Sequence, residues 1–505
     1  MSKQKIMLVA FYNKKALGVR YLETALRESG YDVYTVFYKD FNSKRPTRTT
    51  AKELELLKAE IEAVQPMMIG LSVMSSMYLD TVHDMIHMIQ ENFQTPIVCG
   101  GAFASMFPEH FLDRNIPYVI RCDGERAFCK LADAVLNGTD YTGIPSLCYR
   151  KDESNIINPI GDVLSDIDGY GLPTVNSTNA CFIECDSLTR GDPQLDTMSY
   201  EVIASRGCPF TCSYCACPNL RQILPKDVKG VRTRSVKSVI DELIEAKKHC
   251  KRIMFVHFYD EIFPNLPGWV DEFVVEYKKH INLPFTIWSH PKMTDAEVTK
   301  KLVSVGLVEV IMGIQSGSEH IRKDIFHRYE SQEDIIKATH TIRDAGVFWT
   351  NYDFMLRHPF ETLEDLKKTY YLIKQLRTPF ELQLHGLNFL PGTNIIPMAI
   401  EAGYYTKEEM DAVMYAPMED QFGVFWHRDT TPESELWYRM CFCLQFKRLR
   451  KKIVKFEDNP LAHADEINKL YAKGQKLTRP QYIYHKSRIV LKRYWMRFKG
   501  FFRRK

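Results

Sequence analysis

The chain has 505 residues, of which 45% are hydrophobic, 26% charged and 12% aromatic. At about 100–200 residues per domain, this length predicts about three domains that each bury their own core. The 25 glycines and 24 prolines are an ordinary number, which excludes a collagen-like or wholly disordered chain. A formal net charge of +4 gives no reason to expect a nucleic acid as partner.

Targeting signals and cysteine usage favour the cytoplasm. No apolar run approaches the roughly 18 residues that cross a bilayer, and the apolar stretch at 5–11 is too short for a signal peptide. The 13 cysteines are therefore expected to be reduced, and most of them to be small core residues. We expect a cytoplasmic protein without a disulfide framework.

Residues 1–145 alternate short apolar strands with longer helical segments. Strands are expected at 5–11, 32–38, 67–73, 96–99 and 118–121, and helices at 17–29, 51–64, 79–93 and 126–136. This alternation predicts a doubly wound parallel sheet, in which ligands bind beyond the carboxyl ends of the strands. Small and polar residues occupy these ends, namely Ser72, Ser75, Gly100, Gly101 and Gly124.

The rest of the chain divides into three further parts. Residues 146–197 have weak periodicity and many turn residues, so we expect a linker. Residues 198–400 carry six β–α pairs, which predict a partial (β/α)6 barrel of the TIM type with its chemistry at the carboxyl ends of the strands. Residues 401–505 predict a helical, finally basic region. The fold class is α/β, with a Rossmann-like sheet before the partial barrel.

Three cysteines follow the first barrel strand with the spacing C-x3-C-x2-C, at Cys208, Cys212 and Cys215. Three thiolates on one loop fit three irons of a [4Fe–4S] cluster and leave the fourth iron open to a small ligand. The alternatives are a structural zinc site, with Cys217 as the available fourth ligand, and a coincidence of buried thiols. The spacing C-x-C after C-x2-C is awkward for one tetrahedron, so the cluster is favoured.

With three later segments, this loop resembles the radical S-adenosylmethionine (SAM) family over residues 198–395. The segments are VHFYDEIF at 256–263, GIQSGSE at 313–319 and LPGT at 390–393, in the order of the family. The resemblance implies that the three cysteines hold a [4Fe–4S] cluster whose open iron binds SAM.

For SAM itself, the resemblance implies contacts from two parts of the barrel. Tyr214 would lie against the adenine, and Asp260 or Glu261 would bind the methionine ammonium, because a carboxylate is the right partner for a cation. Gln315 and Ser316 would bind the ribose or the carboxylate. The alternative for residues 315–318 is a tight turn whose polar groups serve the backbone.

One segment departs from the family. Where the family has Gly-x-Pro-Gly-Glu-Thr after the fifth strand, this chain has RHPFET at 357–362. We expect Arg357 and His358 to reach the substrate. The alternative is a surface arginine and a satisfied histidine.

The first domain resembles the cobalamin-binding domain that precedes many radical SAM domains. The matching segments are LGVRYL at 17–22, IGLSVMS at 69–75, VCGGAFA at 98–104 and DGE at 123–125. Glycines let the backbone approach a bulky corrinoid, and serines offer hydroxyls. The alternative is a sheet that has lost its ligand. The resemblance implies cobalamin contacts from Leu17, Gly18, Ser72, Ser75, Gly100, Gly101, Gly124 and Glu125.

The Asp-x-His-x-x-Gly loop of other cobalamin proteins, whose histidine ligates cobalt, is missing after the first strand. Residues 13–18 read NKKALG instead. We therefore expect cobalamin to bind without a histidine as lower ligand.

Together the two resemblances imply a methyltransferase that delivers a methyl group from methylcobalamin to an unactivated carbon through a 5′-deoxyadenosyl radical. They leave open ring closure, ring rearrangement or oxidation without methyl transfer, and also a non-catalytic iron–sulfur or cobalamin sensor. The expected partners are a small-molecule or lipid-like substrate and a reductant such as flavodoxin or ferredoxin, with no nucleic acid.

The C-terminal region ends in a basic stretch. Residues 479–505 contain no acidic residue, and helical spacing puts Leu491, Tyr494 and Trp495 on one face, together with later phenylalanines. Such a helix can lie on an anionic membrane surface. The alternatives are a helix docked on the barrel and a basic tail for an anionic substrate. For Trp426, His427 and Trp437, a core role is favoured over a cap on the active site.

Overall fold

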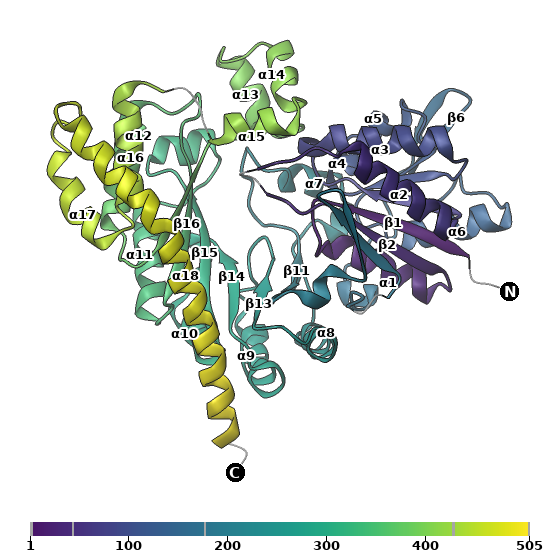
Figure 1. Ribbon diagram of the computed structural model, residues 1–505, viewed down its shortest axis with the longest axis horizontal. Coiled ribbons are helices and arrows are strands. Elements are labelled where there is room, and N and C mark those ends of the chain that lie inside the picture. The colour runs from purple at the N-terminus through teal and green to yellow at the C-terminus, as the bar shows by residue number, and fades with distance from the viewer. Residues whose placement is uncertain (1–3, 43–44, 176–177, 427–429, 503–505) are drawn as a thin grey trace.

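The computed structural model describes residues 4–42, 45–175, 178–426 and 430–502, without the side chains of 424–426 and 497–502. Two α/β units stand side by side, and a long C-terminal helix crosses the second of them (Figure 1). The first unit contains a sheet of nine strands and the second a sheet of six.

The first unit is a parallel sheet with helices on both faces, as the alternation predicted. An apolar core lies on each face, one made with α2 and α3 and the other with α1 and α6. The central strand order is β5-β4-β3-β1-β2, so the chain reverses direction across the sheet beside β1. The elements are β1 (Lys5–Phe11), α1 (Leu17–Glu28), β2 (Asp32–Tyr38), α2 (Ala51–Val64), β3 (Met68–Ser72), η1 (Ser76–Tyr78), α3 (Leu79–Asn92), β4 (Ile97–Gly100), α4 (Ala102–Met106), α5 (Glu109–Leu112), β5 (Tyr118–Ile120) and α6 (Glu125–Asn137).

The segment that the sequence places in a linker extends this sheet at both edges. β6 (Leu147–Lys151) and β7 (Ser154–Ile157) add antiparallel strands beyond β5. β8 (Ala180–Glu184) pairs parallel with β2, and β9 (Ser187–Arg190) pairs antiparallel with β8. These edge strands are partly exposed, which explains their weak hydrophobic periodicity.

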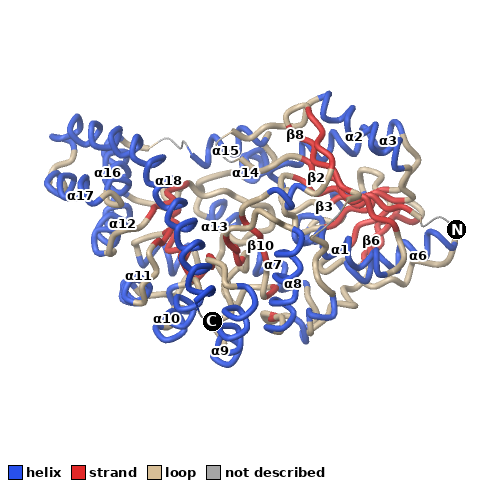
Figure 2. The backbone as a smooth tube through the Cα atoms, turned by 60° about the horizontal axis from the view of Figure 1, so that its bottom comes forward, coloured by secondary structure: helices blue, strands red, loops and turns tan. Residues whose placement is uncertain are grey.

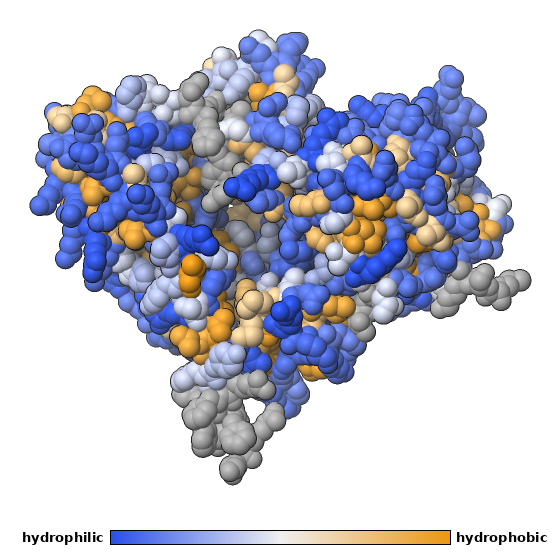
Figure 3. Space-filling model, viewed as in Figure 1, coloured by the Kyte–Doolittle hydropathy of each residue, from blue (hydrophilic) through white to orange (hydrophobic). Residues whose placement is uncertain are grey.

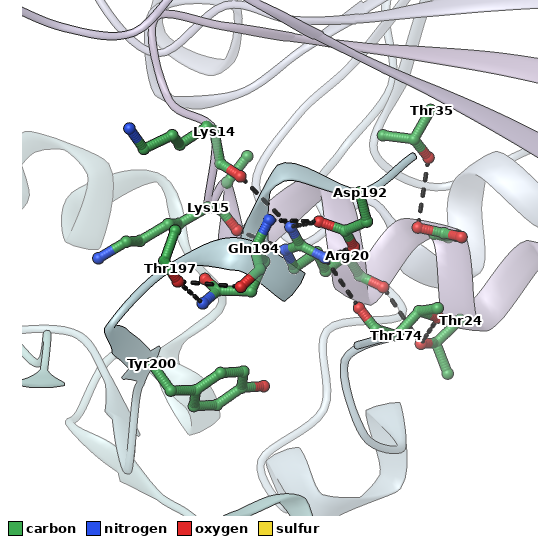
Figure 4. A network of polar contacts seen from close by, with 12 residues as sticks. Lys14, Lys15, Arg20, Thr24, Thr35, Thr174, Asp192, Gln194, Thr197 and Tyr200 are labelled. Carbon is green, nitrogen blue, oxygen red and sulfur yellow. Dashed lines mark hydrogen bonds and ion pairs between the residues drawn. The ribbon is translucent and has the colours of Figure 1, made fainter. Parts of the chain in front are cut away.

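A buried ion pair ties the end of this segment to α1. The Nη1 and Nη2 atoms of Arg20 donate to the carboxylate of Asp192, at 2.5 and 2.7 Å, just before η3 (Pro193–Asp196) (Figure 4). Nearby, the Lys15 ammonium lies 2.7 Å from Glu201 on the first barrel strand. The two units are therefore joined by charged contacts as well as by the chain.

The second unit is the expected open barrel of six parallel strands, in the order β10-β13-β14-β15-β16-β17. Its helices lie along the outside (Figure 2). The elements are β10 (Ser199–Val202), β11 (Ser205–Arg206), α7 (Cys217–Ile223), η4 (Lys226–Val228), β12 (Arg232–Thr233), α8 (Val236–His249), β13 (Phe255–Phe258), α9 (Pro267–Glu276), η5 (Tyr277–Ile281), β14 (Phe285–Ser289), η6 (Pro291–Met293), α10 (Ala296–Val305), β15 (Leu307–Gln315), η7 (Ile321–Ile325), α11 (Gln332–Asp344), β16 (Trp349–Met355), α12 (Leu363–Gln375) and β17 (Glu381–His385).

Residues of these strands alternate between an apolar outer face and a polar inner face. The outer positions, such as Val256, Phe258 and Tyr352, belong to the core beneath the helices. The alternate positions carry polar side chains that the register places on neighbouring strands. One such row across the inner face consists of Glu201, His257, Thr286, Glu309 and Trp349.

The C-terminal region is helical, as expected, and contacts both units. Met418 and Phe422 of α15 enter the core of the first unit, while α16 packs against α12 and α18. Within the described residues, no helix has the length and apolarity that a membrane span requires. The elements are α13 (Ile395–Glu401), α14 (Lys407–Met414), α15 (Met418–Trp426), α16 (Pro432–Cys443), α17 (Lys447–Ile453), η8 (Val454–Phe456), η9 (Leu461–His463) and α18 (Ala464–Phe502).

Candidate active site

The cysteine loop follows β11 and is held in place by elements far along the chain. The Arg221 guanidinium of α7 donates to the Cys208 carbonyl oxygen at 2.6 Å. The Ser213 hydroxyl donates to the Ile325 carbonyl oxygen at 2.6 Å, and the Ile395 N–H donates to the Ser213 carbonyl oxygen at 2.9 Å. Hydrogen bonds with three separate segments of the chain therefore fix the conformation of the loop.

The three thiols on this loop fit the donor set of a [4Fe–4S] cluster. All three are free, and Cys212 is buried. Burial raises the pKa of Cys208 to about 11 and also raises that of Cys212, whereas a hydrogen bond from Cys217 lowers the pKa of Cys215. The Cys217 N–H also donates to the Cys215 sulfur at 3.4 Å, so this position already stabilises a thiolate. Among the residues described, no group of three or more His, Cys, Asp or Glu side chains lies close enough together to hold a single metal ion.

An interdomain cleft with about 1210 Å³ of empty space, part of it open to solvent, separates this loop from the first unit. A narrower sheet cavity of about 440 Å³ continues from it toward the strand ends of the first sheet, between mainly apolar side chains such as Leu8 and Phe128. The cleft is the space in which a corrinoid would lie between the two units, and the sheet cavity opens from it at the strand ends. From the first unit, the cleft is lined by Gly18, Ser72, Gly101, Gly124 and Glu125, and from the second by Arg206, Gly207, Cys217, Arg221 and Glu261, among others.

Two glycines that line the sheet cavity stand where a side chain would collide with neighbouring atoms. Gly101 has φ +96°, and a Cβ there would lie 2.6 Å from the Val73 carbonyl oxygen. A Cβ on Gly70, in the sheet cavity, would lie 2.8 Å from the side chains of Leu8 and Phe128. No histidine of the described residues lines either cavity, and cobalamin binding without a histidine ligand to cobalt stays a prediction.

The other residues expected to bind cobalamin differ in whether they line the cleft or the sheet cavity. Gly100 lines the sheet cavity. Leu17 and Ser75 line neither cavity: Leu17 begins α1, and the Ser75 hydroxyl accepts the Met77 N–H at the start of η1. A role for these two residues in binding stays a prediction.

Asp260 and Glu261, the two acidic residues that follow β13, have different surroundings. Asp260 is 2% exposed and accepts hydrogen bonds from the Ala204 N–H at 2.9 Å and the Ser205 hydroxyl at 2.6 Å. Burial raises its pKa to about 7, and its second oxygen has no hydrogen-bond partner. Glu261 instead lines the cleft beside Cys217, where desolvation raises its pKa. Asp260 thus fixes the start of the cysteine loop, and Glu261 is the carboxylate that faces the cleft.

The remaining residues expected to bind SAM differ in whether their polar atoms already have hydrogen-bond partners. The Tyr214 hydroxyl accepts a hydrogen bond from Arg328 at 3.3 Å. Gln315, with φ +71°, keeps a buried side-chain oxygen without a hydrogen-bond partner, an acceptor that suits a ribose hydroxyl. The Ser316 hydroxyl accepts the Ser318 N–H at 3.1 Å and is fully buried, as the tight-turn alternative describes.

Comparison with known families identifies both units. The model of the radical SAM superfamily matches residues 202–373, and the model of the B12 binding domain matches residues 4–132. These matches cover the cysteine loop and the cobalamin candidates, and together they span more than half of the chain. The chain therefore contains a radical SAM domain preceded by a B12 binding domain. Its cofactors are a [4Fe–4S] cluster, SAM and cobalamin.

Curated relatives and solved structures agree with this assignment. The uncharacterized methyltransferase PH0819 of Pyrococcus horikoshii is 25% identical over 390 residues, which cover 76% of this chain and 78% of the relative. An anaerobic magnesium-protoporphyrin IX monomethyl ester cyclase of Cereibacter sphaeroides is 22% identical over 366 residues, 70% of this chain and 55% of its own length. The radical SAM methyltransferase TsrM from Kitasatospora setae, solved with cobalamin and a [4Fe–4S] cluster, matches with a TM-score of 0.61 at 20% identity, covering 79% of this chain and 78% of TsrM. At that identity the likeness establishes the fold.

Sequence reasoning missed the arginine that joins the two cofactor domains. Arg206 reaches across the cleft to Glu125 at 2.7 Å and to Asp123 at 3.2 Å. Its guanidinium lies between the rings of Tyr21 and Tyr170, 4.7 and 4.6 Å from their centroids. The acidic residues on either side of Gly124 were the available signal, since they needed a cation to face them.

A second arginine of this radical SAM domain was also missed. Arg328 donates to Glu330 at 2.6 Å and to the Gly313 carbonyl oxygen at 2.7 Å. Its positive charge favours the thiolate form of Cys212, although burial raises the pKa of that thiol overall. Arg328 therefore links the cysteine loop, through Tyr214, to the end of β15.

Arg357 and His358 do not line the interdomain cleft. Arg357 pairs with Glu435 of α16, and its guanidinium lies 3.5 Å from the centroid of the Tyr438 ring. His358 is 3% exposed and packs beside Phe326, at 5.1 Å between ring centroids. Arg357 therefore anchors α16, whereas His358 packs against Phe326 at the end of η7, and substrate contact stays a prediction for both.

Of the aromatic residues considered as a cap, Trp437 is 2% exposed and packs on Tyr370, as expected of a core residue. The Trp426 side chain and His427 lie outside the described part of the chain.

Proposed function

We propose that the protein is a methyltransferase that transfers a methyl group to an unactivated carbon of a small molecule. The observation that carries the proposal is the interdomain cleft, since Ser72 and Gly101 of the cobalamin-binding domain line the same space as Gly207 and Cys217 of the cysteine loop. The similarity to a curated methyltransferase over 76% of the chain supports it.

When bound, the cluster and SAM supply radical hydrogen abstraction, and cobalamin supplies the methyl group. The chain holds and orients these groups. Cys208, Cys212 and Cys215 would hold the cluster. Glu261, which lines the cleft, would bind the ammonium of SAM, and the free oxygen of Gln315 would accept a hydrogen bond from the ribose. An external reductant of the flavodoxin or ferredoxin type delivers the electron.

The substrate's polar groups bind along the inner face of the barrel. Asp353 lies between Gly313 and Gln383 in the register of the sheet, one row nearer the cysteine loop than Asn351. Burial raises the pKa of Asp353 to about 7, so it can donate or accept a hydrogen bond near neutral pH. This polar face favours a substrate with hydrogen-bonding groups near the carbon that reacts.

The proposal is tested on protein that is purified and reconstituted without air, with methylcobalamin, a low-potential reductant and SAM labelled at its methyl group. A methyltransferase releases 5′-deoxyadenosine, forms S-adenosylhomocysteine and passes the label to cobalamin and then to substrate. The matched control is Cys212→Ser, which removes one cluster ligand. Absence of 5′-deoxyadenosine from the wild-type protein would favour the sensor alternative and overturn the proposal.

Ring closure is the second candidate, because a curated cyclase is similar over 70% of the chain. The same experiment separates the two. A cyclase forms 5′-deoxyadenosine without transfer of the labelled methyl group, whereas a methyltransferase yields a labelled product.

A further inference from the structure

The long helix α18 docks on the barrel through one face only. The His485 ring stacks on Trp349, with 4.6 Å between ring centroids and 14° between planes. Ile489 is 1% exposed and Met496 is 7% exposed. The Asn282 side chain also donates to the Met496 carbonyl oxygen at 3.4 Å. The docked face therefore runs through His485, Ile489 and Met496.

The opposite face of α18 carries large apolar side chains in solvent. We call it the outer stripe. At 3.6 residues per turn, its members fall within a sector about 120° wide, roughly opposite the docked face. It comprises Ile483, Tyr484, Leu491, Tyr494 and Trp495, which are 56%, 56%, 65%, 59% and 49% exposed.

Basic residues border the outer stripe on both sides. Arg488 and Lys492 follow one edge of it, and Lys486 and Arg493 follow the other. The Lys492 ammonium lies 4.7 Å from the centroid of the Trp495 ring, so charge and aromatic surface stand together. No acidic residue occurs anywhere from residue 479 to the end of the chain.

The position of α18 leaves this face accessible. The helix runs along the outer side of the barrel, and its last turns extend past the other elements (Figure 1). Hydrophobic residues are visible at the surface where α18 runs through the lower part of the molecule (Figure 3). A flat surface can therefore reach the outer stripe without meeting the cobalamin-binding domain.

We infer that the outer stripe of α18 binds an anionic membrane surface, with the helix lying parallel to it. Tyrosine and tryptophan are the residues that favour the headgroup region of a bilayer, since one end of each is apolar and the other polar. Lysine and arginine on both edges add electrostatic attraction to anionic lipids, each contributing a further increment near the surface. The charge of this segment is complementary to such a surface along its whole length.

The two faces of α18 match two of the three interpretations of the basic C-terminus, namely docking on the barrel and binding to a membrane. Docking on the barrel accounts for the face at His485 and Ile489, and membrane binding accounts for the outer stripe. An acidic protein would be attracted by the same charges, but it would not by itself need five large exposed apolar side chains. Exposed apolar surface of this kind, bordered by cations, is typical of interfacial helices.

The test uses the full-length protein and flotation with vesicles of phosphatidylcholine, with and without phosphatidylglycerol. We expect binding to the anionic vesicles, weaker binding at high salt and little binding to phosphatidylcholine alone. In the triple variant Leu491→Ser, Tyr494→Ser and Trp495→Ser, we expect a loss of at least about tenfold in the bound fraction. A second variant, Arg488→Glu with Lys492→Glu, should lose binding to anionic vesicles only.

The matched controls are Leu136→Ser on α6 and Leu461→Ser on η9, which are 45% and 54% exposed on elements other than α18 and should float like the wild type. Equal melting temperatures show that the α18 variants fold. Release of 5′-deoxyadenosine from SAM should be unchanged in them, so this test fails or succeeds apart from the proposed function. Wild-type protein that stays with the unbound fraction, or a triple variant that floats normally, overturns the inference. A concentration-dependent dimer that the triple variant loses would assign the stripe to self-association instead.

Discussion

Arg206 and Glu125 form an ion pair of 2.7 Å across the interdomain cleft. Arg206 stands two residues before the first cluster cysteine, and Glu125 is both the last residue of the DGE segment and the first residue of α6 in the cobalamin-binding domain. Their side chains are 16% and 5% exposed. This pair therefore sets how the cysteine loop faces the cobalamin cleft.

Replacing Arg206 by glutamine should loosen the contact between the two domains. It leaves Glu125 buried without its cation, a change that costs about 3–5 kcal/mol for pairs of this kind, whereas Asp123 keeps its ion pair with Arg232 at 2.7 Å. We expect a lower melting temperature and less cobalamin retained after gel filtration, read from the absorption spectrum. Arg206→Lys should have a melting temperature and a cobalamin content between those of the wild type and Arg206→Gln. Lysine keeps the charge, but it cannot bind two carboxylates at once or stack between two tyrosine rings.

The control for this prediction is Arg377→Gln. Arg377 also pairs with a carboxylate, Asp344 at 2.6 Å, but the two side chains are 50% and 67% exposed, so we expect a change of less than about 1 kcal/mol. If Arg206→Gln keeps its cobalamin and melts like Arg377→Gln, the pair is not what holds the domains together.

Gly101→Ala should block the approach of cobalamin. The new Cβ would lie 2.6 Å from the Val73 carbonyl oxygen at a backbone φ of +96°, which an L-residue rarely adopts. We expect a loss of about 1–3 kcal/mol of stability and reduced cobalamin binding, measured by thermal unfolding and by spectral titration. Gly143→Ala, with nothing within 4 Å of its Cβ position, should change neither. Unaltered cobalamin affinity in Gly101→Ala would contradict the placement of the cofactor.

Cys217→Ala should keep the cluster that Cys212→Ser loses. Cys217 contributes its N–H to the Cys215 sulfur, and alanine retains that N–H. Iron and sulfide contents, together with the electron paramagnetic resonance spectrum of the reduced protein, distinguish the variants. A Cys217→Ala protein that loses its iron would instead make Cys217 a ligand.

Local patterns were enough to predict the architecture, because the alternation of apolar and polar residues repeats within each strand. The six barrel strands and the first sheet follow from it. β9 was not predicted from the sequence, because its mostly exposed residues show no such pattern. Local sequence also could not predict that Arg357 pairs with Glu435, which lies 78 residues further on. Contacts of this range, like that of Arg206, are set by packing between elements and leave no periodic signal.

The buried carboxyl of Glu309 gives the stability of the protein a specific pH dependence. Glu309 is 5% exposed on the inner face of β15, and it accepts a hydrogen bond from Asn351 at 2.6 Å. Burial raises its pKa to about 7, although Lys486 favours the charged form. The neutral His485, whose pKa is lowered by burial to about 3, stands 3.6 Å away.

Because the folded pKa is raised, the folded protein keeps a proton that the unfolded chain releases. The contribution to stability is fully present below the unfolded pKa of 4.5 and is lost as the pH rises through about 7. Glu309→Gln keeps an acceptor for Asn351 and removes the titration, so its stability relative to the wild type should increase between pH 5 and 8, by at most about 3 kcal/mol. Melting temperatures across this range measure the effect, and the exposed Glu297→Gln serves as control. A difference between Glu309→Gln and the wild type that does not change with pH would show that Glu309 ionises at its ordinary pKa.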